Sequence, residues 1–83
     1  MTPTQINKAI RAGQIFYVKD PLARPPKNEL IVERAKTITN RSGLRRVKVE
    51  TMIGWLFATE VRRAGSFEPI TLDGEGPMTR WMN

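Results

Sequence analysis

The sequence predicts a small α+β domain: an antiparallel sheet of three to five strands with a short N-terminal helix and a second helix over 51–64. Three observations support this class: a proline-led amphipathic start, β-branched runs separated by proline and glycine, and a hairpin signal near Gly43. The chain has 83 residues, enough for one domain with a modest core. We predict a single basic domain at 1–72 and a flexible, glycine-rich C-terminal tail at 73–83.

The first expected element is a helix over 3–12. Pro3 suits the first turn of a helix, where its missing N–H is not needed. Ile6 and Ile10 are spaced to share one helical face, and Gly13 is a natural stop. A helix this short is stable only when it packs on a sheet.

Three strands are expected from composition. The runs 14–19 and 29–39 are rich in β-branched and aromatic residues, and the proline-rich segment 20–28 separates them. A further strand over 66–72 contains Pro69, which lacks a ladder donor and therefore predicts an edge position.

A hairpin is predicted around a three-residue loop, 41–43, with Gly43 in the left-handed conformation. This loop sets a register in which paired residue numbers sum to 84. One face of the hairpin is then apolar, with Ala35 opposite Val49. The other face is basic, and the register pairs its residues as Arg34 with Glu50, Lys36 with Lys48, and Ile38 with Arg46.

The segment 51–64 allows two interpretations. As a helix it is capped by Thr51 and ends in the two arginines before Gly65. As a strand it alternates well, with Trp55 and Phe57 on one side. Its length favours the helix, which we predict, and its composition favours the strand.

Composition limits the chemistry. The chain contains no histidine and no cysteine, which removes the commonest general base, the usual metal ligands and disulfides. Its eight acidic residues are scattered along the sequence, so we expect no enzyme, no metal and no cofactor. No apolar run approaches the roughly 20 residues that span a bilayer, and we expect a cytoplasmic protein without a membrane span.

The net charge of +6 is unevenly distributed. Residues 1–64 contain 13 basic and five acidic side chains (+8), whereas residues 65–83 contain one and three (−2). Such a basic body suits a polyanion, which means nucleic acid or an acidic protein surface.

The expected function is non-catalytic binding of nucleic acid through the basic hairpin face. Exposed aromatic residues beside it, Trp55 or Tyr17, would stack on unpaired bases, and Trp81 in the tail would dock on the body or on a partner. The alternative is a small accessory protein that inhibits or adapts another protein through aromatic and arginine contacts. The residues predicted to neutralise phosphates are Arg34, Lys36, Arg45, Arg46, Lys48, Arg62 and Arg63.

The runs GQIFYVKDP, LIVERAKTI and RRVKV resemble those of small SH3-like barrel proteins of bacteria and their phages. The resemblance covers about residues 13–50. It implies a barrel closed by a short last strand, here FEPITL, and the family is mostly of unknown function. A phage-type origin would imply a protein that interacts with its host. The segment 51–65 is longer than such proteins usually have at this place.

Overall fold

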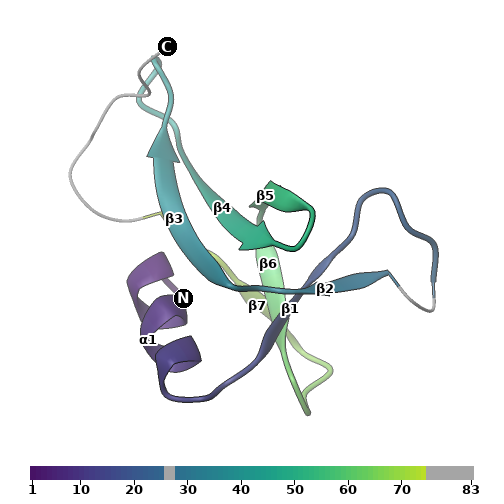
Figure 1. The fold of residues 1–83 in the computed structure, drawn as a ribbon. Helices are drawn as coiled ribbons and strands as arrows, with labels where there is room; N and C mark the ends of the chain where they lie inside the picture. The colour runs from purple at the N-terminus through teal and green to yellow at the C-terminus, as the bar shows by residue number, and fades with distance from the viewer. Residues whose placement is uncertain (26–27, 75–83) are drawn as a thin grey trace.

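The computed structural model describes residues 1–25 and 28–74, which form one helix and seven short strands (Figure 1). The strands make two antiparallel sheets, ordered β2-β1-β6-β7 and β3-β4-β5. This confirms a small α+β domain with a short N-terminal helix. The expected single sheet of three to five strands is instead two sheets, of four and three strands. The elements are α1 (Pro3–Arg11), β1 (Phe16–Lys19), β2 (Glu29–Ile31), β3 (Arg34–Thr39), β4 (Arg45–Thr51), β5 (Gly54–Ala58), β6 (Glu60–Arg63) and β7 (Pro69–Thr71).

The chain passes from one sheet to the other at two places, and the first divides the single strand expected over 29–39 into β2 and β3. Between β2 and β3, the Val32 N–H donates to Phe16 in β1, and the next N–H, of Glu33, donates to Glu50 in β4. Between β5 and β6, Thr59 accepts from the Leu72 N–H, on the β7 side. Pairing among the described strands therefore forms two separate sheets and no closed barrel.

Helix α1 confirms the expected N-terminal helix to within one residue. The Thr2 hydroxyl accepts from the Gln5 N–H, and the Gln5 side chain accepts from the Thr2 N–H, which together form a capping box. The helix buries Ile6 completely against the sheets. Among the described residues, no helical segment has the length and apolar character that crossing a bilayer requires.

The hairpin of β3 and β4 has the predicted register, in which Ala35 is opposite Val49 and Lys36 is opposite Lys48. Gly43 adopts the left-handed conformation, with φ of 83°, and closes the three-residue loop. Asn40 supports this loop, because its side-chain oxygen accepts from two backbone N–H groups, those of Ser42 and Leu44. Turn chemistry thus determines which side chains face outward.

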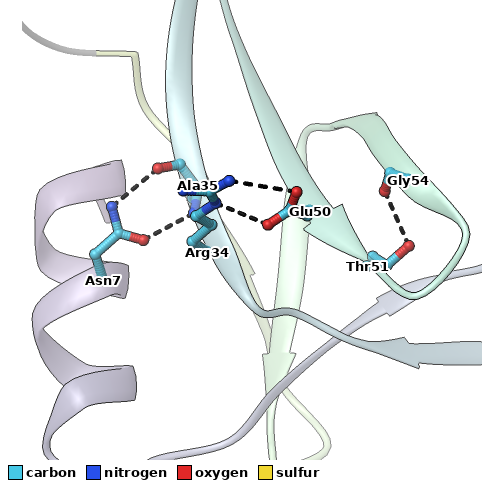
Figure 2. Close-up of polar contacts among 6 residues, drawn as sticks. All are labelled: Asn7, Arg34, Ala35, Glu50, Thr51 and Gly54. Carbon is cyan, nitrogen blue, oxygen red and sulfur yellow. Dashed lines mark hydrogen bonds and ion pairs between the residues drawn. The ribbon is translucent and has the colours of Figure 1, made fainter.

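The predicted helix over 51–64 is wrong, because this segment forms β5 and β6. Gly54 has a φ of 110°, a conformation that side chains disfavour, and Thr51 donates a hydrogen bond of 3.1 Å to its carbonyl across the turn (Figure 2). The residues alternate: Trp55 and Phe57 face out from one sheet, and Val61 is buried under the other. Each half of the segment finds a strand partner, which a helix would have lost.

The core lies between the inner faces of the two sheets and under α1. Phe16 and Ile6 are fully buried at its centre. The other buried apolar residues are Val18, Val32, Ala35, Val47, Val49, Val61 and Leu72. The strand predicted at 66–72 is confirmed as the shorter edge strand β7. The predicted tail lies outside the described residues, apart from Asp73 and Gly74.

One side chain protects the edge of the three-stranded sheet. Asn7, half-buried on α1, donates from its amide nitrogen to the Ala35 carbonyl at 2.9 Å and accepts from the Ala35 N–H at 2.8 Å (Figure 2). This pair of bonds reproduces what a neighbouring strand would supply to β3. These bonds join the helix to the sheet and fix the position of β3. The outward side chains of β3 belong to the candidate site.

Candidate functional site

The outward-facing side chains of β3, β4 and β5 form one surface, which we call the basic face. Because side chains alternate along a strand, the burial of Ala35, Val47 and Val49 on the inner side leaves their neighbours pointing outward. Two rows run across the three strands, and a shorter one crosses β3 and β4. The rows are Arg34–Glu50–Trp55, Lys36–Lys48–Phe57 and Ile38–Arg46.

Four cations dominate the charge of the basic face. They are Arg34, Lys36, Arg46 and Lys48. Glu50 is the only acidic residue among the outward positions of these described strands, so the face has a formal charge of +3. Its carboxylate accepts from Arg34 Nε at 2.7 Å (Figure 2). This hydrogen bond raises the pKa of the Arg34 guanidinium and holds it in position.

Two aromatic rings lie among these cations. Lys36 Nζ is 4.2 Å and Arg34 Cζ is 5.3 Å from the ring centre of Trp55. Arg46 Cζ is 3.9 Å and Lys48 Nζ is 4.5 Å from the ring centre of Phe57. All four distances fall within the range of cation–π attraction.

The rings explain how two lysines can lie directly opposite each other. Like charges in cross-strand positions destabilise a sheet. In the structure, Lys36 and Lys48 extend over different rings, which keeps their charges apart. The strand β5 therefore stabilises the basic face, because its two aromatic rings attract the cations of β3 and β4.

The structure groups only some of the residues that the sequence suggested. Arg34, Lys36, Arg46, Lys48 and Trp55 share the basic face. Other suggested residues lie elsewhere. Arg45 begins β4, and its side chain lies on the opposite side of the sheet from that of Arg46. The four-stranded sheet contains Tyr17, Arg62 and Arg63, and Trp81 lies outside the described residues.

Phe57 is the residue of the face that sequence reasoning did not include. Its side chain is 39 % exposed and lies beside two cations. Phe57 follows Trp55 by two residues, so the two side chains share a face if the segment is a strand. The helix that we predicted does not place them together.

Arg62 has a structural environment in the four-stranded sheet. Its guanidinium makes two hydrogen bonds to the Glu29 carboxylate, of 2.8 and 2.7 Å, and lies 4.8 Å from the ring centre of Tyr17. A third nitrogen donates to the Ser66 carbonyl at 2.9 Å. The hydrogen bond from Arg62 lowers the pKa of Glu29 and raises that of Arg62. Arg62 thus links β2, β1 and β6, and we do not include it in the basic face.

Replacing Glu29 by glutamine is expected to lower the free energy of unfolding at pH 7 by up to about 1 kcal/mol, as for a partly exposed ion pair. Because the folded-state pKa of Glu29 is lowered, its contribution is present above the unfolded-state pKa and is lost as pH falls through the folded-state value. Urea unfolding should therefore show a difference between Glu29→Gln and the original protein at pH 7 that shrinks as the pH is lowered through the folded-state pKa of Glu29. Glu68→Gln, an exposed acid, is the control, and equal stability of the two variants at pH 7 would refute this role.

Comparison with protein-family models, with curated proteins and with solved structures finds no match to this chain. The resemblance to SH3-like barrel proteins therefore stays a prediction. The interpretation of the site rests on its own geometry and charge.

Proposed function

We propose that this protein is a non-catalytic binding module that binds nucleic acid through the basic face. The observation that carries the proposal is the set of four cations, gathered on one sheet around Trp55 and Phe57. Phosphates supply the negative charge that such a surface attracts, and bases supply flat rings for its aromatic residues. The proposal places the protein in the cytoplasm.

The outward side of the four-stranded sheet is less suited to a polyanion than the basic face, because it carries no net charge. Its outward positions carry Lys19 and Arg62 against Glu29 and Glu60, which leaves no net charge. Arg62 already binds the Glu29 carboxylate. A polyanion is therefore attracted to the three-stranded sheet and not to its neighbour.

The proposal predicts a steep dependence of affinity on salt. If Lys36, Arg46 and Lys48 each neutralise one phosphate, the logarithm of the binding constant falls by about 2 to 3 per tenfold rise in salt. Raising sodium chloride from about 50 to about 200 mM should then weaken binding about 20- to 40-fold. Fluorescence anisotropy of a labelled oligonucleotide measures this slope, and a salt-independent affinity would contradict the proposal.

A second candidate function is binding of a protein, such as a host protein bound by a small phage-type inhibitor. Exposed apolar side chains favour it: Ile31 is 56 % and Met52 is 85 % exposed, and both line one shallow pocket. An interface built on these residues depends on apolar contact and responds little to salt. Loss of binding in Met52→Ser, without a salt effect, would favour this candidate over nucleic acid.

A further inference from the structure

The two aromatic rings of the basic face are placed at successive outward positions of one strand. Trp55 and Phe57 are two residues apart in β5, which separates their attachment points by about 7 Å. Bases within a duplex follow each other about every 3.4 Å and remain paired inside the stack. Rings this far apart can each receive a base only if neighbouring bases are unstacked from one another, and single strands meet this condition.

The same cations serve both the rings and the ligand. Lys36 lies over Trp55, and Arg46 and Lys48 lie over Phe57. A cation over an exposed ring gains less free energy than one that donates a charge-assisted hydrogen bond to a phosphate. Arriving phosphates therefore draw Lys36, Arg46 and Lys48 off the rings, and the parts of the rings that these side chains cover become available to bases. Arg34, which Glu50 holds, stays beside Trp55.

We propose that the basic face binds single-stranded nucleic acid, with two neighbouring bases stacked on Trp55 and Phe57 and their phosphates held by Lys36, Lys48 and Arg46. This inference rests on the proposed function and specifies its ligand. Stacking accepts every base, because all four have a flat aromatic surface. The protein should therefore bind single strands with little preference for sequence.

The test compares strands and duplexes at about 50 mM salt by anisotropy. The probes are a 12-nucleotide thymidine strand, the matching uridine strand and a 12-base-pair DNA duplex. Each stacked base contributes about 5- to 150-fold in affinity, so Trp55→Leu with Phe57→Leu should weaken single-strand binding at least about 25-fold. The ratio of single-strand to duplex affinity should fall at least tenfold. The control Phe67→Leu, a 96 % exposed aromatic residue outside the face, should leave both affinities unchanged.

A spectroscopic measurement excludes a purely structural effect of the substitutions. In a Trp81→Phe background, Trp55 is the only tryptophan, and stacking of a base should quench its fluorescence as the strand binds. Trp55→Phe, which keeps an aromatic ring, should retain most of the single-strand affinity. Inorganic polyphosphate should bind without quenching.

The outcomes separate this inference from the proposed function. Duplex binding as tight as single-strand binding, or a double leucine variant that loses both equally, would overturn the single-strand inference and leave nucleic-acid binding standing. Absence of binding to all three probes would overturn both. Tighter binding of either single strand than of the duplex would support the inference. The difference in affinity between the thymidine and the uridine strand would then show whether DNA or RNA is preferred.

Discussion

Reversing the charges of Lys36 and Lys48 together is expected to weaken nucleic-acid binding about 100-fold or more at about 50 mM salt, because each neutralised phosphate contributes about tenfold there. The two side chains form a directly opposed pair at the centre of the basic face. Their replacement by glutamate changes the charge of the face from +3 to −1, since each reversal removes two units. The inner apolar face is untouched, so the domain should remain folded by circular dichroism.

A matched control keeps the same total charge. Lys8→Glu with Arg11→Glu also lowers the net charge from +6 to +2, but it alters the last turn of α1 and not the face. This control should bind within a few-fold of the original protein. Equal loss in both double variants would mean that only the net charge matters, and the basic face would have no special role.

Replacing Asn7 by alanine is expected to lower the free energy of unfolding by about 1–3 kcal/mol, the range for partly buried hydrogen bonds that lose their partners. Both bonds to Ala35 vanish, and the edge of β3 loses its N–H and carbonyl partners. Urea unfolding followed by circular dichroism measures the change.

Two further variants identify the cause of this loss. Asn7→Leu keeps the side-chain volume but not the hydrogen bonds, so it should be as unstable as the alanine variant. Lys8→Ala, at the next and exposed helix position, should change stability by less than about 0.5 kcal/mol. A leucine variant as stable as the original protein would show that packing, and not the amide, holds α1 to the sheet.

The parts of the fold that local chemistry decides were predictable from the sequence. The loop 41–43 fixes the register of β3 and β4 through Gly43, because only one turn geometry places the valines on the inner side. Helix α1 was equally local, since Thr2, Pro3 and Gln5 supply its start. Because side chains alternate along each strand, this register places Lys36 and Lys48 on the same face of the hairpin.

Tertiary pairing decided the parts that the sequence left open. Residues 51–64 satisfy a helical period and a strand alternation, and the choice depends on partners far away in sequence, namely β4 for β5 and β1 for β6. The same limit applies to the site. Trp55 joins the basic face only because β5 pairs with β4, and Arg62 leaves it because Glu29 lies across β1.

The most direct test of the account is to map the bound surface by nuclear magnetic resonance. A nitrogen-15-labelled sample is titrated with the 12-nucleotide thymidine strand, and the shift of every backbone amide is followed. If the basic face binds the strand, the largest changes cluster in β3, β4 and β5, with those at Lys36, Lys48 and Trp55 among them. Changes centred on Tyr17 and Arg62 in the four-stranded sheet, or none at saturating strand, would contradict it.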